Sequence, residues 1–248
     1  GILYFPKINT EYDSIVGKIK LYNNQVCIAD NIKEVIPEFL LLLKGVIDCP
    51  DLPLNVSRSA LQNDGFVQKI SEYISKKVAD KLTGMCKTDR ESYEKYWDDI
   101  SPFIKYGCIK DAKFAEKMGD YVLFKNLDGK YLTLKDCIEE NKKETEETEA
   151  QTEEKKEDAA ESENKDNAEA KEPEKTVIFY ITDEVQQSQY INMFKEAGKD
   201  AVILKHNIDS AFISSLEQKH QDVQFKRIDA DLTEEMKGEG TADEATVK

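Results

Sequence analysis

Long hydrophobic runs are missing from this chain of 248 residues. The longest, Phe39-Leu-Leu-Leu-Leu43, ends at Lys44-Gly45, far short of the roughly 18 residues that cross a bilayer. The first residues carry no charged region followed by an apolar stretch, as a secretion signal would. We therefore expect a cytoplasmic protein without a membrane segment. Because the chain opens at Gly1 rather than at a methionine, we also expect it to be a piece of a longer protein.

Histidine and closely spaced cysteine are also scarce. The two histidines, His206 and His220, lie far in sequence from every cysteine, and no C-x-x-C pair occurs. Zinc sites and disulfide frameworks need such clusters, so the sequence predicts neither. Reduced and mostly buried thiols are expected at the five cysteines, which are Cys27, Cys49, Cys86, Cys108 and Cys137.

A basic excess is absent as well, because 50 acidic residues outnumber 35 basic ones. Much of the acid lies in two segments: residues 139–175 hold 16 acids and 7 lysines, and residues 229–248 hold 7 acids and 2 lysines. The rest is nearly neutral, with 27 acids against 26 bases. Without a basic excess to displace counterions from phosphates, we expect no nucleic-acid binding.

The two acidic segments predict disorder. Alanine is the only hydrophobic residue type in 139–175, so this insert cannot bury enough apolar surface to fold. A solvated linker is the simplest interpretation, and an acidic docking tail or a cation buffer is the functional alternative. Residues 229–248 predict an acidic flexible tail that leads toward a missing C-terminal domain.

Residues 1–85 predict a larger α/β segment. Pro37 suits the first turn of a short apolar helix through Leu43. Ser57 is a candidate cap for helical residues that continue to Met85. Strands are expected at residues 2–5, 19–22, 25–28, 45–48 and 54–56.

Residues 86–138 predict a helical connector. One helix is expected to begin at the cap Thr88-Asp89 and to end at Gly107. Another follows at 111–118, and Thr133-x-x-Asp136 has the spacing of a capping box before a short helix.

Residues 176–228 predict a small β-α-β-α-β unit with parallel strands and right-handed crossovers. Ile181-Thr-Asp-Glu184 stands where a glycine-rich dinucleotide fingerprint would follow the first strand, so we expect no such cofactor there. The whole chain is therefore assigned to the α/β (α+β) class: a three-layer α/β sandwich, a helical connector and this small unit.

Arg58 is the conspicuous candidate site residue, because only three of the basic residues are arginines. It falls in the first turn of an expected helix, where its charge opposes the helix dipole by a few tenths to about 1 kcal/mol. Gln62 lies four residues later, on the same helix face. A guanidinium and an amide at a helix start can hold phosphate oxygens. The alternative is a local ion pair of Arg58 with Asp48 or Asp51.

The residues around Arg58 closely resemble the middle domain of the ninety-kilodalton heat-shock chaperones, especially the bacterial HtpG branch. The stretches 36–48 and 51–62 keep the family's lysine-glycine-valine-valine-aspartate strand and its asparagine, serine-arginine and leucine-glutamine positions. Residues 177–182 and 208–212 resemble later parts of the family, so the similarity spans essentially all of the chain expected to be ordered. The matching motif positions are Lys44, Gly45, Val46, Ile47, Asp48, Asn55, Ser57, Arg58, Leu61 and Gln62.

The resemblance implies one domain of a homodimeric, ATP-dependent chaperone. Family members bind ATP with magnesium in an N-terminal domain, and the middle-domain arginine, Arg58 here, contacts the terminal phosphate with support from Gln62. Non-native client proteins contact the middle and C-terminal segments. The fragment is expected to be monomeric and, without the N-terminal ATP-binding domain of the same chain, inactive toward ATP. Residues 9–17 are shorter and less apolar than the family's client-contacting loop.

Two other functional classes remain open on the residues alone. One is a protein-interaction module that works without any nucleotide. The other is a stand-alone α/β enzyme that binds a small molecule at the strand ends Thr182-Asp183 and Lys205-His206.

Overall fold

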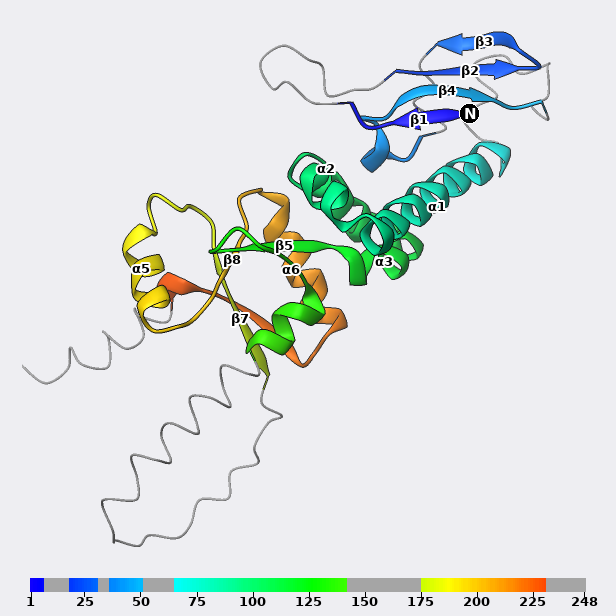
Figure 1. The fold of residues 1–248 in the computed structure, drawn as a ribbon. Coiled ribbons are helices and arrows are strands. Elements are labelled where there is room, and N and C mark those ends of the chain that lie inside the picture. The colour runs from blue at the N-terminus through cyan, green and yellow to red at the C-terminus, as the bar shows by residue number, and fades with distance from the viewer. Residues whose placement is uncertain (7–17, 31–35, 51–64, 142–174, 231–248) are drawn as a thin grey trace, which may run out of the picture. The chain divides into compact units, whose positions relative to one another are not determined.

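The computed structural model describes residues 1–6, 18–30, 36–50, 65–141 and 175–230 (Figure 1). The chain forms two compact units, Gly1–Val122 and Leu123–Lys248, each with its own sheet. The expected α/β class is confirmed, because each unit combines a sheet with helices.

The first unit contains a four-stranded sheet in the order β1-β4-β2-β3. Neighbours β1 and β4 are antiparallel, β4 and β2 are parallel, and β2 and β3 form a hairpin. The hairpin turns at Asn24 and Gln25, both with positive φ, which suits the twist of the flanking strands. The strands are β1 (Ile2–Tyr4), β2 (Ile19–Asn23), β3 (Val26–Asp30) and β4 (Lys44–Asp48).

Gly45 is required where β1 crosses close to β4. Its φ is 149°, and a Cβ atom there would lie 2.0 Å from the carbonyl oxygen of Ile2. The glycine of the lysine-glycine-valine motif is therefore required by its backbone conformation and by the close approach of β1.

The apolar segment before β4 differs from the expected helix. Only Glu38–Leu40 is helical, as the 3-10 turn η2, and the chain then runs through a turn to β4. Leu40, Leu42 and Leu43 are nonetheless buried, since the segment packs as core rather than as a regular helix.

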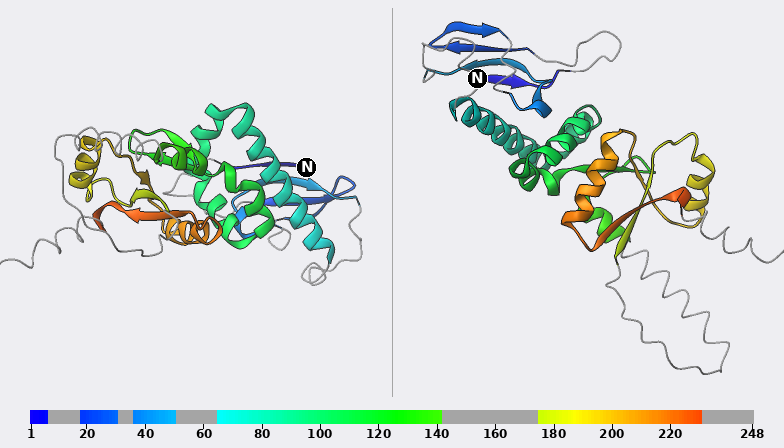
Figure 2. Two further views of the ribbon diagram at one scale, coloured as in Figure 1. Left: turned by 90° about the horizontal axis from the view of Figure 1, so that it is seen from below. Right: turned by 180° about the vertical axis from the view of Figure 1, so that it is seen from behind.

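Among the described residues of the first unit, three α-helices pack on one another (Figure 2). They are α1 (Gly65–Thr88), α2 (Arg90–Lys110) and α3 (Ala112–Met118). The predicted cap at Asp89 is confirmed, because its carboxylate accepts from the amide of Ser92 at 3.3 Å. Asp111 caps α3 in the same way, accepting from the amides of Lys113 and Phe114.

The predicted stop at Gly107 is wrong, since α2 continues to Lys110. Gly107 is instead a packing position, where a Cβ atom would lie 2.5 Å from the ring of Phe39 and 3.0 Å from the ring of Phe114. These two rings meet at 4.8 Å between centroids. The absence of a side chain at Gly107 is therefore what lets both rings approach α2.

The second unit contains a five-stranded sheet in the order β6-β5-β8-β7-β9. The expected β-α-β-α-β alternation of residues 176–228 is confirmed, with β7 parallel to both β8 and β9. Figures 1 and 2 show α5 and α6 on opposite sides of these strands, as right-handed crossovers to either side of β7 require. The elements are β7 (Thr176–Ile181), α5 (Ser188–Glu196), β8 (Val202–Ile203), α6 (Ile208–Lys219) and β9 (Val223–Arg227).

The last part of the expected helical connector, 86–138, is not helical throughout. Residues 123–133 form a hairpin of β5 (Leu123–Asn126) and β6 (Tyr131–Thr133), and β5 pairs antiparallel with β8. The predicted capping box is confirmed: the Thr133 amide donates to the Asp136 carboxylate, and the Asp136 amide donates to the Thr133 hydroxyl. The helix that it starts is described over residues 134–141, so the first three residues of the expected insert are helical.

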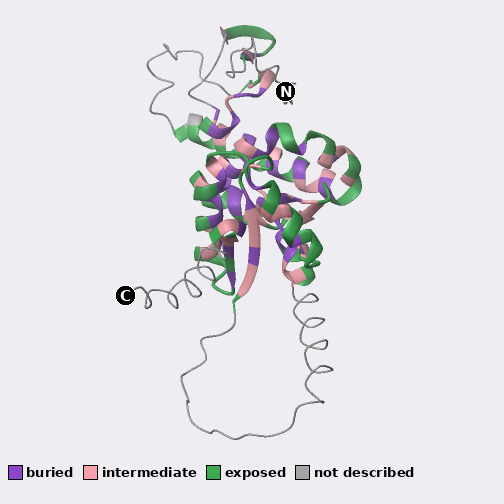
Figure 3. Cartoon of the chain, turned by 90° about the vertical axis from the view of Figure 1, so that its left-hand side faces the viewer, coloured by how far each residue is buried: buried purple, intermediate pink, exposed green. Residues whose placement is uncertain are grey.

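Aromatic and aliphatic residues are buried in the core of the second unit. Figure 3 colours the buried residues of the chain purple along its strands and helices. The ring of Phe124, on β5, lies 6.3 Å from that of Phe212 and 6.0 Å from that of Phe225. Phe124 thus brings the hairpin into the same core as α6 and β9.

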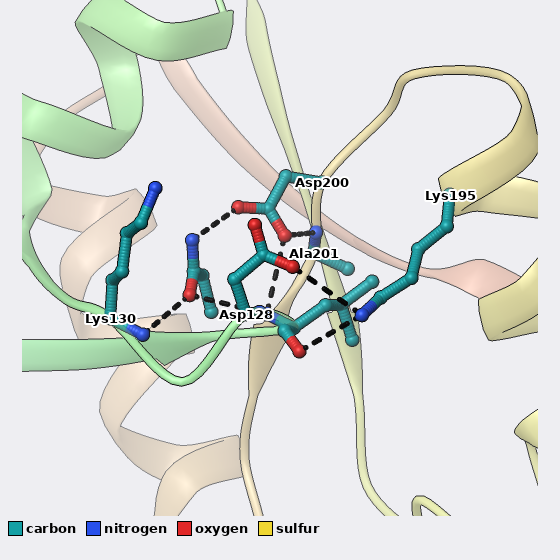
Figure 4. Close-up of polar contacts among 7 residues, drawn as sticks. Asp128, Lys130, Lys195, Asp200 and Ala201 are labelled. Carbon is teal, nitrogen blue, oxygen red and sulfur yellow. Dashed lines mark hydrogen bonds and ion pairs between the residues drawn. The ribbon is translucent and has the colours of Figure 1, made fainter.

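A polar cluster fixes the hairpin turn to β8 (Figure 4). The carboxylate of Asp200 accepts from the Asn126 side-chain amide at 2.7 Å and from the backbone amides of Leu127 and Ala201 at 3.2 and 2.8 Å. Lys195 donates to the Leu127 carbonyl at 3.2 Å. The polar groups of the turn are in this way satisfied by Asp200, which lies just before β8, and by Lys195 of α5.

Candidate functional site

The predicted site residues Arg58 and Gln62 lie outside the described residues, as do the expected strand at 54–56 and the candidate cap Ser57. The structure describes the two elements that flank them, β4 and α1. The segment that carries both residues therefore follows Pro50, two residues after the end of β4, and precedes Gly65, where α1 begins.

The exit from β4 is held firmly to the hairpin of β2 and β3. The Asn23 side chain is buried and donates to the carbonyls of Cys49 and Pro50 at 3.1 and 3.3 Å. The Cys49 amide donates to the Tyr22 carbonyl at 2.9 Å. The point where the chain leaves the sheet toward Arg58 is thus fixed by hydrogen bonds to Tyr22 and Asn23, the last two residues of β2.

Asp48, one of the two acids considered as a local partner of Arg58, contacts the same hairpin. Its Oδ2 accepts from the backbone amide of Gln25 at 3.2 Å. One oxygen of this exposed carboxylate is therefore hydrogen-bonded to the turn between β2 and β3.

The two other arginines form local ion pairs. Arg90 lies 2.6 Å from Glu94, one turn along α2, and also donates to the Cys86 sulfur at 3.3 Å. Arg227 donates to both carboxylate oxygens of Asp229, and this contact raises the pKa of Arg227 above its usual value. Both guanidinium groups are therefore committed to neighbouring acids.

An apolar cavity of about 420 Å³ lies between α1 and α2, beside the end of β1. Tyr93 in its wall is buried and donates to the Tyr121 carbonyl at 2.8 Å, and burial raises the pKa of its hydroxyl. Tyr96 is half exposed at the rim. Such a cavity can accept an apolar side chain. It is lined by Phe5, Pro6, Leu82, Met85, Tyr93, Lys95, Tyr96, Asp99 and Ile100.

The alternative enzyme site at the strand ends of the second unit is small. Thr182, Lys205 and His206 do line a common cavity, but its volume is only about 110 Å³, well below the roughly 300 Å³ of small-molecule sites. Asp183 is not among the lining residues, and its carboxylate accepts from the backbone amides of Val185 and Gln186.

The polar groups beside this cavity serve the backbone. The Gln187 oxygen accepts from the amides of Thr182 and Asp183 at 2.8 and 3.1 Å. Buried Asp209 accepts from the His206 amide at 2.9 Å. These contacts shape turns, so the residues brought together here favour structure over catalysis.

The described parts of the chain lack a metal-binding cluster and a membrane-spanning helix. No three histidine, cysteine, aspartate or glutamate side chains there lie close enough together to hold a metal ion. Nor does any helix in those parts combine the length and apolarity that crossing a bilayer demands.

Comparisons with known proteins found a matching family, similar curated proteins and a similar solved structure. The Hsp90 protein family matches residues 2–148. "Chaperone protein HtpG" of Bacteroides fragilis is 38% identical over 237 residues, which cover 95% of this chain and 31% of the relative. The same-named protein of Porphyromonas gingivalis is also 38% identical, over 93% of this chain and 30% of its own length. The chain thus spans about a third of the length of these relatives.

The fold also has a counterpart among solved structures. The middle domain of a Plasmodium falciparum heat-shock protein superposes with a TM-score of 0.56, over 91% of this chain and 80% of that one. The sequence identity is 20%, so this similarity concerns the fold alone.

Proposed function

Because this chain belongs to the Hsp90 protein family, we propose that it is the middle-domain part of an ATP-dependent chaperone like HtpG. In the intact protein it supplies Arg58 to the terminal phosphate of ATP, and Gln62 supports that contact. ATP and its magnesium ion are held by the N-terminal ATP-binding domain of the same chain, and two chains form a homodimer.

The proposed role of Arg58 has a clear physical basis. Phosphoryl transfer spreads negative charge over the transferred group, and a cation held against it in a site poor in water stabilises the transition state. When another domain supplies that cation, hydrolysis requires the domains to close first. The ATPase would then be controlled by the conformational cycle that acts on client proteins.

The position of the motif carries this proposal. Lys44–Asp48, which begins the family motif, forms a central strand of the first sheet, and the residues after it are anchored at Cys49 and Pro50. Arg58 follows this anchor and lies within the family match. Since Arg90 and Arg227 are paired locally, neither offers an obvious substitute.

The test is Arg58→Ala in the intact protein. Loss of one transition-state cation should lower kcat for ATP hydrolysis about a hundredfold, equivalent to about 3 kcal/mol, with little change in ATP affinity at the N-terminal domain. Arg227→Ala is the matched control and should keep normal turnover, because its partner Asp229 is local. Normal turnover of the Arg58 variant would refute the proposed role.

A protein-interaction module that needs no nucleotide is the second candidate, favoured by the apolar cavity between α1 and α2. The two candidates are separated by adding the purified N-terminal domain to this chain. Stimulated ATP hydrolysis supports the chaperone proposal. Client binding without any stimulation supports the module.

A further inference from the structure

A groove between α1 and α3 combines an apolar floor with charged walls. Its volume is about 340 Å³. Ser75, Ala79 and Phe114 are buried along the floor, whereas Tyr73 is 60% exposed at the rim. An exposed aromatic residue above a buried apolar floor offers a place for an incoming apolar side chain.

The walls of this groove carry lysines on both sides. Lys69 and Lys76 come from α1, two helical turns apart, and Lys113 and Lys117 come from α3, one turn apart. Only two acids, Glu72 and Asp111, line the groove with them. In a chain with a net charge of −15, this is a local excess of positive charge.

The ion pairs that these lysines form with nearby acids are exposed to solvent. Lys113 lies 3.4 Å from Glu72, with 80% and 53% of the two side chains exposed. Lys117 lies 2.5 Å from the exposed Asp80, whose pKa it lowers. Exposed pairs of this kind contribute little stability, so an incoming carboxylate can exchange with them at small cost. Asp111 is committed to capping α3.

We propose that this groove, lined by residues of α1 and α3, binds an acidic segment of another polypeptide. Carboxylates of the segment pair with lysines on both walls, and an apolar side chain of the segment packs between Tyr73 and Phe114. The proposal rests on charge and shape, and it does not depend on Arg58 or on ATP.

A peptide suits the groove better than a nucleic acid does. Glu72, Asp80 and Asp111 stand among the lysines and would repel a continuous row of phosphates. A peptide can space its carboxylates around these acids. The cations here are all lysines, which act as point charges and lack the planar bidentate fork with which arginine holds phosphate.

Fluorescence anisotropy on the 248-residue chain, without ATP and at low salt, tests the proposal. The probe is a labelled peptide of about 12 residues, rich in glutamate and aspartate, with one central phenylalanine. Lys69→Glu combined with Lys113→Glu reverses one exposed charge on each wall and should weaken binding at least tenfold. Lys81→Glu combined with Lys219→Glu makes the same charge change at exposed helix positions outside the groove, and should weaken binding less than twofold.

Two further probes complete the experiment. The same peptide with glutamine and asparagine in place of its acids should bind at least tenfold more weakly, and so should a 12-nucleotide single strand of thymidines. Equal loss in the groove and control variants would overturn the proposal in favour of general charge attraction. Equal binding of the neutral peptide or of the oligonucleotide would also overturn it. Thermal unfolding of both variants, expected to match the parent, confirms that only binding has changed.

Discussion

Asp200 accepts hydrogen bonds from a side chain and from two strand-end amides, so one carboxylate joins the hairpin turn to β8. Asp200→Ala should lower the free energy of unfolding by about 2 kcal/mol, because the buried amide of Asn126 loses its charged acceptor. Urea unfolding followed by circular dichroism measures this change. Asp128→Ala is the control: its exposed carboxylate meets Lys195 only at 3.4 Å, and the expected change is below about 0.5 kcal/mol. Equal effects in the two variants would contradict the role of Asp200.

Cys137 gives a pH-dependent prediction. Burial, together with the nearby acids Glu140 and Asp136, raises the pKa of its thiol from 9.0 to about 12. In the native protein at pH 9, iodoacetamide should therefore modify exposed Cys27 well before Cys137, as mass spectrometry of peptides can show. Comparable rates at the two residues would contradict the burial of Cys137.

The same shift affects stability. Above pH 9 the unfolded state loses the Cys137 proton while the folded state keeps it, so the free energy of unfolding falls as the pH rises. The contribution of this thiol is at most about 1.4 kcal/mol per pH unit between the two pKa values.

At the scale of elements, Gly84 of α1 and Gly107 of α2 should respond in opposite ways to alanine. Gly107→Ala should destabilise the chain by about 1–3 kcal/mol, because the new Cβ atom meets the rings of Phe39 and Phe114. Gly84→Ala should stabilise it by about 0.5–1 kcal/mol, because alanine has the better helix propensity and the added Cβ atom would have no atom within 4 Å beyond its chain neighbours and its own helix backbone. Denaturant midpoints measure both changes in stability. Destabilisation by Gly84→Ala would contradict the finding that a Cβ atom at position 84 has room around it.

Helix boundaries were predictable where their causes are local. The caps at Asp89 and at Thr133 with Asp136 lie within three residues of the amides they serve, so spacing alone identified them. The stop at Gly107 was predicted wrongly because its actual role depends on Phe39, which lies 68 residues earlier. Sequence spacing cannot reveal a ring that arrives from a distant segment.

At the scale of the whole molecule, the segment 142–174 separates two parts of one sheet. It connects the helix over residues 134–141 to β7 and is 33 residues long. Replacing it by a flexible linker of about 12 residues should raise the free energy of unfolding by no more than about 1 kcal/mol, because loop-closure entropy varies slowly with length. A loss of several kcal/mol in urea unfolding would instead indicate that the segment contributes contacts.

The parallel part of this sheet was predictable because its strands and helices alternate along the chain, whereas the hairpin was not. Asn126 of β5 pairs with Val202 of β8, 76 residues later, so no local sequence pattern could predict the pairing. Asp128-Gly129 is a turn signal that could have suggested a hairpin, but not its partner. Arg58 and Gln62 were singled out first by the scarcity of arginine and their four-residue spacing and then by family resemblance, and their role stays a prediction.

The late pairing of β5 has a consequence for how the chain is made. The hairpin leaves the ribosome before β8 has been translated, and synthesis at about 5–20 residues per second separates the two by several seconds. During that interval the edge of β5 and the ring of Phe124 lack the neighbours that later cover them. A nascent domain of this topology is therefore itself open to unwanted association until its last third emerges.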